Sequence, residues 1–144
     1  MDDAALTRLV ISAIIRVHQV LGPGFLENIY REALILELVK RGLRVEKEKS
    51  ITVVYDGEEV GTHRLDILVE GRIIIELKTV EELSRAHYAQ LRSYLKATGL
   101  ELGILVNFAK EKADFRRVEA LKSPIPLSPH IPSSPFLHKE RSHG

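Results

Sequence analysis

Residues 64–78 constrain the fold of this chain more than any other stretch. Two strongly apolar segments flank the Glu70-Gly71 pair, a pattern typical of a hairpin of two buried strands. Three charged residues, Asp66, Glu76 and Lys78, lie inside these segments or at their ends. Because an unpaired buried charge is costly, charges in buried strands usually pair with one another or bind an ion. The stretch therefore predicts a functional site built on a central hairpin.

The rest of the chain reads as helices and strands in a definite order. Apolar residues recurring every three or four positions predict helices, whereas alternation or short apolar runs predict strands. Ser84 is a good N-cap, and Gly42 and Gly99 are good helix ends. On these patterns we expect helices over residues 6–21, 26–41 and 85–98, and strands over residues 51–55, 59–69, 72–79 and 100–108.

This order of elements predicts an α/β fold. Asp56-Gly57 and Glu70-Gly71 join three strands into an antiparallel meander, and the strand–helix–strand order over 72–108 predicts a parallel crossover. We expect a mixed sheet of four or five strands flanked by helices, since residues 115–121 could form either an edge strand or a short helix. Residues 1–122 are expected to form one domain, and the Pro- and Ser-rich residues 123–144 a disordered tail.

The register of the central hairpin decides whether its charges meet. A two-residue turn would pair Asp66 with Ile75 and send Asp66 to the wrong face, whereas a three-residue turn with Gly71 bulged pairs Asp66 with Glu76. The apolar pattern does not choose between these registers, because both strands are apolar on both faces. Only the second register lets Asp66 and Glu76 share a cation, so we predict the bulged turn.

A carboxylate pair of this kind suits a divalent cation. Two adjacent carboxylates repel each other unless a proton or a cation lies between them, and Lys78 alone does not satisfy both. Hard oxygen ligands favour Mg²⁺ or Mn²⁺, which bind through carboxylates, waters and substrate phosphate oxygens. The chemistry that fits is phosphodiester hydrolysis, with Lys78 orienting a water or stabilising the developing charge.

Bulk properties leave this hypothesis open. The net charge of +1 predicts no global attraction to nucleic acid, so any attraction has to be local. The chain has no Cys, which excludes a disulfide framework and a thiolate nucleophile and fits the cytoplasm, where we expect the protein to be. The acidic start Met1-Asp2-Asp3 does not fit a signal peptide, and no uninterrupted apolar run reaches about 20 residues, so no membrane contact is expected.

Four sequence elements together resemble the PD-(D/E)xK nuclease superfamily. Asp66 followed by Glu76-Leu77-Lys78 looks like its signature, although Leu65 stands where that superfamily often has Pro. Gly24 to Tyr30 fits Gly-x-x-Glu-x-x-Tyr, the label of the GxxExxY family of that superfamily. Gln90 to Tyr94 is similar to the Gln-x-x-x-Tyr element of its exonuclease branch. The resemblance extends over roughly residues 6–118 and implies a restriction-endonuclease-like core.

The resemblance also implies roles for individual residues. It makes Asp66 and Glu76 metal ligands and Lys78 the catalytic lysine. The Leu77 carbonyl and Glu27 would be further ligands, Glu27 directly or through water. Gln90 and Tyr94, one helical turn apart on one face, would contact the substrate or position Lys78, and so would Tyr30, three residues after Glu27. The activity implied is that of a Mg²⁺-dependent nuclease acting on nucleic acid, with DNA favoured.

Other hypotheses remain open. Asp66 and Lys78 could form a plain buried ion pair, Glu27 could be an acid favoured by the helix dipole, and both tyrosines could be core aromatics. The chain could also be a catalytically silent nucleic-acid-binding or assembly module. A third alternative is a Holliday-junction resolvase-like endonuclease, which would have to be a homodimer.

Overall fold

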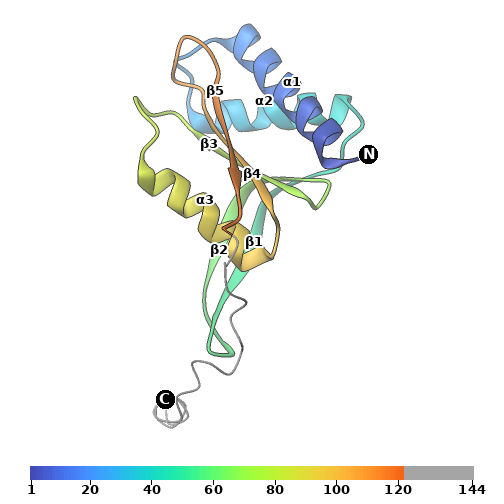
Figure 1. Cartoon of the computed structure of the whole chain (residues 1–144). Coiled ribbons are helices and arrows are strands. Elements are labelled where there is room, and N and C mark those ends of the chain that lie inside the picture. Colours follow the sequence, from blue (N-terminus) through green and yellow to red (C-terminus); the bar gives the residue numbers. More distant parts are fainter. Residues whose placement is uncertain (122–144) are drawn as a thin grey trace.

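The computed structural model describes residues 1–121, so the tail expected over 123–144 lies outside the described part of the chain. Three helices and five strands follow one another along the described residues (Figure 1). They are α1 (Asp3–Leu21), α2 (Glu27–Lys40), β1 (Val45–Tyr55), β2 (Glu58–Val69), β3 (Ile73–Lys78), α3 (Arg85–Thr98), β4 (Leu102–Asn107) and β5 (Asp114–Glu119).

The strands form one mixed sheet in the order β1-β2-β3-β4-β5. β3 and β4 are parallel and are joined through α3, while the other neighbours are antiparallel. This confirms the predicted α/β class, the meander and the crossover. Residues 115–121, which the sequence left undecided, contribute β5, since Phe115 packs into one core and Val118 into the core on the opposite face of the sheet.

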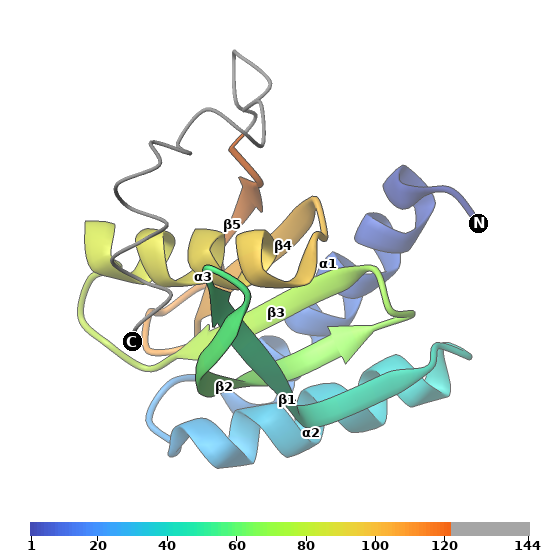
Figure 2. The same ribbon diagram turned by 90° about the horizontal axis from the view of Figure 1, so that it is seen from below.

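The helices cover both faces of the sheet, as Figure 2 shows: α1 and α2 lie on one face and α3 on the other. The first core joins α1 and α2 to side chains such as Ile75 and Val106, and the second joins α3 to side chains such as Ile74 and Leu105. Successive residues of β3 thus point into different cores, as the strand period requires. Both faces are buried, which explains why this strand is apolar throughout.

Helix α1 is the longest element of the first layer. The Asp2 side chain caps it by accepting a hydrogen bond from Ala5 N at 2.8 Å. By length and mean hydropathy alone α1 is apolar enough to cross a membrane, although charged residues interrupt its apolar sequence. Its apolar side chains Leu6, Val10 and Ile14 are fully buried in the core, and a core helix of a globular domain passes the same test. The finding is weak evidence for a span.

The turn between β2 and β3 has the predicted register. Val69 pairs with Ile73, so the connection has three residues, and Gly71 has a left-handed φ of 63°. Glu70 is also left-handed, with φ 54°, which the sequence did not predict. Its backbone N–H donates to the Arg44 carbonyl at 2.9 Å, and its carboxylate accepts from Arg44 N at 2.6 Å. These two bonds hold Glu70 against the start of β1 and offset its unfavourable backbone conformation.

Candidate active site

The candidate site lies at the fork where β2 separates from β3. The pairing of these strands ends at Ile67 and Ile75, and β2 continues with β1 as a two-stranded ribbon that projects beyond the sheet (Figure 1). At the fork the Asp66 N–H donates to Glu76 Oε1 at 3.2 Å, and the Leu77 N–H donates to Asp66 Oδ2 at 2.9 Å. Each carboxylate thus accepts a backbone N–H of the neighbouring strand, where a continued β-ladder would have a backbone carbonyl as the acceptor. The predicted convergence of Asp66 and Glu76 is confirmed.

Strand β2 rotates at Asp66. Leu65 packs into the core under α3, whereas Ile67 packs into the core under α1 and α2. Strict alternation would place residues 65 and 67 on the same face. The strand therefore turns over between them, at the half-buried Asp66.

Glu76 is the most perturbed group of the site. The pKa of its carboxyl is raised from 4.5 to about 8, and the largest cause is the almost complete burial of the side chain. The negative charge of Asp66 and a hydrogen bond with the Asp66 side chain contribute to this rise, while the Asp66 backbone N–H and Lys78 oppose it. Without a cation, the pair is therefore held together by a proton near neutral pH.

Helix α3 brings two of the predicted residues to the end of β3. The Ser84 side chain and the His87 side chain form a capping box that starts the helix. One turn further on, Gln90 Oε1 accepts a hydrogen bond from Lys78 Nζ at 3.2 Å, so Gln90 orients the lysine. Tyr94 is nearly buried, and its pKa is raised by burial and then by the charges of Glu76 and Asp66, which places its hydroxyl in the electrostatic field of the pair.

Helix α2 approaches the pair from the other side with its first residue. Burial raises the pKa of Glu27, and the charge of Asp66 raises it further, whereas Lys78 and Arg31 lower it. Glu27 therefore lies within electrostatic reach of the site. Arg31, one turn later, forms an ion pair with Asp66 at 3.8 Å between Nη1 and Oδ1. The sequence interpretation missed Arg31, although its spacing of four from Glu27 places both on one helix face.

Tyr30 does not reach the site, and the expectation of substrate contact is wrong for this residue. Its side chain is fully buried, and its ring stacks on Phe108 with centroids 4.5 Å apart. Its hydroxyl donates to the Gly22 carbonyl and accepts from Phe25 N at 3.2 Å. Tyr30 therefore holds the loop that leads into α2 and positions Glu27 indirectly.

The predicted metal ligands are only partly assembled. Within residues 1–121, no group of three or more His, Cys, Asp or Glu side chains is arranged to hold a metal ion, so Glu27 does not complete a three-carboxylate cluster with Asp66 and Glu76. The Asp66–Glu76 pair itself fits a hard cation, because its mutual repulsion is relieved here by a proton. The N–H and C=O of a strand residue point to the same side, so the Leu77 carbonyl is directed toward Asp66 as well.

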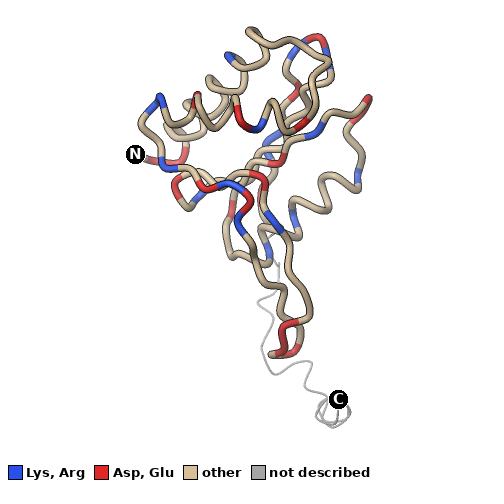
Figure 3. The backbone as a smooth tube through the Cα atoms, turned by 180° about the vertical axis from the view of Figure 1, so that it is seen from behind, with Lys and Arg blue, Asp and Glu red and all other residues tan. Residues whose placement is uncertain are grey.

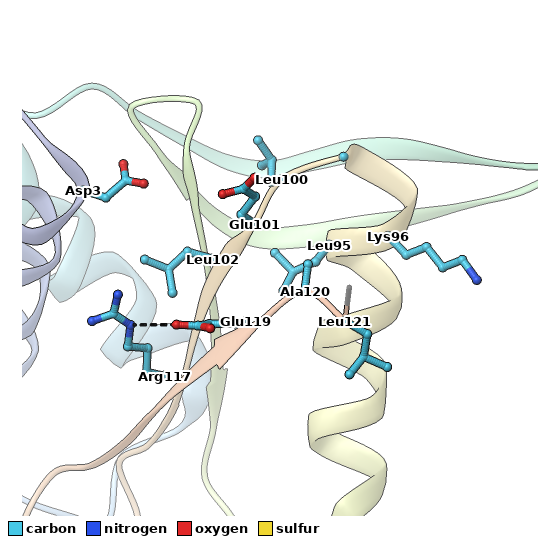
Figure 4. A pocket seen from close by; sticks show the side chains of 11 residues that line it. Asp3, Leu95, Lys96, Leu100, Glu101, Leu102, Arg117, Glu119, Ala120 and Leu121 are labelled. Atoms are coloured by element: carbon cyan, nitrogen blue, oxygen red, sulfur yellow. Dashed lines mark ion pairs between the residues drawn. The ribbon is translucent and has the colours of Figure 1, made fainter. Parts of the chain in front are cut away.

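A cavity of about 460 Å³ lies elsewhere, between the end of α3, the start of β4 and the end of β5 (Figure 4). Its apolar wall includes Leu95 and Leu102, and its charged side chains Arg117 and Glu119 pair with each other at 3.8 Å. This cavity contains none of the residues of the fork, so its size does not identify the site.

Comparison with known families agrees with this geometry. The model of the PD-(D/E)XK nuclease superfamily matches residues 4–118. The chain belongs to this superfamily. The match does not reach the level of the GxxExxY family, and no curated protein matches the chain.

The comparison with solved structures supports the fold through one of them. The crystal structure titled SSO0001 superposes with a TM-score of 0.55 at 23% identity, over 84% of this chain and 61% of that chain, so the present chain spans less than two thirds of it. The alkaline exonuclease LHK-Exo from Laribacter hongkongensis gives a TM-score of 0.45 at 14% identity, over 90% of this chain and 87% of that one. The structure of LHK-Exo in complex with dAMP gives a TM-score of 0.46 at 13% identity, over 80% of this chain and 83% of that one. At 23% identity the likeness to SSO0001 concerns the fold alone.

Proposed function

We propose that this protein is a metal-dependent nuclease that hydrolyses phosphodiester bonds, with Mg²⁺ or Mn²⁺ as the cation and DNA as the substrate. The observation that supports this most is the Asp66–Glu76 pair at the fork, within the field of Lys78. Membership of a nuclease superfamily points to the same reaction class. We also propose the narrower assignment to the GxxExxY family, because Glu27 stands at the site and Tyr30 supports the loop before it.

Each residue of the site has a separate role in the proposed reaction. Asp66, Glu76 and the Leu77 carbonyl would hold the cation, and Glu27 would approach it through water. When bound, the cation supplies Lewis-acid polarisation of the phosphodiester and makes a nearby water more acidic. Lys78, oriented by Gln90, would hold the attacking water or stabilise the charge that develops on the phosphate. Tyr94 would restrict the orientation of the substrate from the α3 side.

Charge distribution supports a local contact with nucleic acid. Figure 3 shows acidic and basic residues interleaved along the described chain, in keeping with the net charge of +1, and acidic residues gathered at the tip of the β1–β2 ribbon. An anionic strand would therefore be attracted mainly by the bound cation and by basic side chains near the fork. A cytoplasmic location and a homodimer remain predictions.

The direct test is cleavage of labelled single-stranded, duplex and branched DNA, and of RNA, with Mg²⁺, Mn²⁺ or EDTA. We expect cation-dependent cleavage that Asp66→Ala and Lys78→Ala reduce at least about a hundredfold, as is usual for removal of a catalytic group. Glu101→Gln, an exposed acid just before β4 at the end of that strand away from Lys78, is the control. Cleavage unaffected by both alanine variants would overturn the site. Binding without cleavage of any substrate would favour the silent binding module instead.

A further inference from the structure

Arg31 is in an unusual electrostatic position beside the carboxylate pair. Its Nε is the buried side-chain polar atom that has no hydrogen-bond partner within residues 1–121. Its ion pairs are all long, with 3.8 Å from Nη1 to Asp66 and 3.5 Å from Nη2 to Glu48. Buried donors are almost always satisfied, so an unsatisfied guanidinium nitrogen next to a reaction site needs an explanation.

The acidic neighbours of Arg31 are held away from it. Glu32 Oε2 lies 4.0 Å from Arg31 Nε, because the same carboxylate bonds to Lys47 Nζ at 3.1 Å. The guanidinium is thus surrounded by negative charge, yet no acceptor among the described residues fills its fork at hydrogen-bond distance. A planar fork of this kind is suited to bidentate binding of a phosphate.

Glu48 places a carboxylate between two guanidinium groups. Its Oε1 lies 3.5 Å from Arg31 Nη2, and its Oε2 lies 3.9 Å from Arg64 Nη1. Glu48 also has a left-handed backbone, with φ 51°, in the middle of β1. The carboxylate is about half exposed, and its 3.9 Å ion pair with the exposed Arg64 contributes little free energy, so an incoming anion can compete with it for that arginine.

We infer that Arg31 and Arg64 form a subsite for a backbone phosphate of the substrate strand beside the Asp66–Glu76 pair, and that Glu48 competes with this phosphate for both guanidinium groups. The two oxygens of Glu48, each facing one arginine, occupy the positions that two phosphate oxygens would take. The inference rests on the proposed function, since it assigns a contact for the same substrate. It adds a phosphate-binding role to Arg31, which contacts Asp66 directly.

The test measures binding without cleavage. Anisotropy of fluorescent single-stranded and duplex DNA is recorded in EDTA over a series of salt concentrations. Arg31→Met and Arg64→Met should each weaken binding about five- to tenfold for every sequence and reduce the slope of log affinity against log salt by about one. Glu48→Gln should strengthen binding about two- to fivefold, because it removes the competing charge.

Each change in charge has a control variant that removes a charge of the same sign elsewhere on the surface. Arg44→Met removes an exposed arginine that pairs with Glu70 beside the β2–β3 turn, and Glu101→Gln removes an exposed acid; both should bind like the wild type. Arg31→Lys keeps the charge but loses the fork, and it should recover only part of the affinity. Thermal unfolding of every variant identifies misfolding, and if Arg31→Met does not fold, the more exposed Arg64 and Glu48 variants decide the question. Wild-type affinity in Arg31→Met, or weaker binding in Glu48→Gln, would overturn the subsite.

Inorganic phosphate separates this inference from the proposed function. If the wild type binds no nucleic acid but is stabilised by phosphate in a way that Arg31→Met abolishes, the subsite stands and the nuclease proposal fails. If nucleic acid is bound and cleaved with no dependence on Arg31 or Arg64, the nuclease proposal stands and the subsite fails. If neither nucleic acid nor phosphate binds, both are overturned.

Discussion

At the scale of single residues, two carboxylates replace part of a β-ladder. Asp66 Oδ2 accepts a backbone N–H from β3, and Glu76 Oε1 accepts one from β2, so both side chains are held without a cation. This arrangement pre-organises the pair, but it buries Glu76, whose pKa rises to about 8. The site therefore stores an unfavourable charge that a proton or a cation has to neutralise.

The raised pKa of Glu76 predicts how stability depends on pH. A carboxyl with a higher pKa in the folded state binds an extra proton there, so its stabilisation is complete below about pH 4.5 and is lost as pH rises toward about 8. In EDTA, Glu76→Gln should therefore be more stable than the wild type at about pH 8 and close to it at about pH 5, the difference growing by at most about 1.4 kcal/mol per pH unit.

Chemical denaturation at both pH values measures this difference, with Glu101→Gln as the control for loss of an exposed acid. A stability difference between wild type and Glu76→Gln that does not change with pH would contradict the assignment of the perturbed group to Glu76.

At the scale of secondary structure, the close packing of α3 on β4 positions Gln90 beside Lys78. Gly103 makes this approach possible, because a Cβ at that position would lie 2.9 Å from Leu91 Cδ1. Leu91 is fully buried and follows Gln90 directly, so a Cβ at residue 103 would press on the helix next to Gln90. The Lys78–Gln90 hydrogen bond of 3.2 Å thus depends on Gly103, although Gly103 lies in β4, Lys78 in β3 and Gln90 in α3.

Gly103→Ala should therefore reduce both stability and catalysis. We expect a loss of about 1–3 kcal/mol in the free energy of unfolding from overpacking, and a fall in kcat larger than any change in KM as α3 moves away from Lys78. Gly61→Ala is the matched control, because a Cβ at Gly61 in the ribbon meets no atom within 4 Å. Equal effects of the two substitutions on unfolding would refute this account of helix placement.

At the scale of the whole molecule, cation binding should be coupled to folding, since the site joins β2, β3 and both helical layers. A ligand that binds only the folded state stabilises it by about 2.7 kcal/mol at a hundredfold excess over its Kd. Mg²⁺ or Mn²⁺ should therefore raise the Tm by several degrees, more at about pH 8 than at about pH 5, where a proton competes for Glu76.

Thermal unfolding with and without the cation measures this shift. Asp66→Asn should abolish most of it, whereas Arg44→Met, just before β1, should keep it. An undiminished shift in Asp66→Asn would mean that the cation binds elsewhere on the protein.

Local patterns in the sequence determined much of this protein. Helical and extended periods predicted the order of the elements, and the need to bring Asp66 to Glu76 predicted the three-residue turn, which pairs Val69 with Ile73. These features depend on contacts between residues near in sequence, where period and turn chemistry are informative.

The surroundings of the carboxylate pair were decided only by the tertiary structure. Which residue of α2 faces the fork depends on the rotation of that helix against the sheet, so Tyr30 lies in the core and Arg31 beside Asp66. The position of Glu48 between two arginines depends on its own left-handed backbone in β1. It also depends on the rotation of β2 at Asp66, which sends Leu65 and Ile67 to different cores. Such contacts join segments that are distant in sequence. They depend on the angle between a helix and the sheet, and no local sequence pattern predicts that angle.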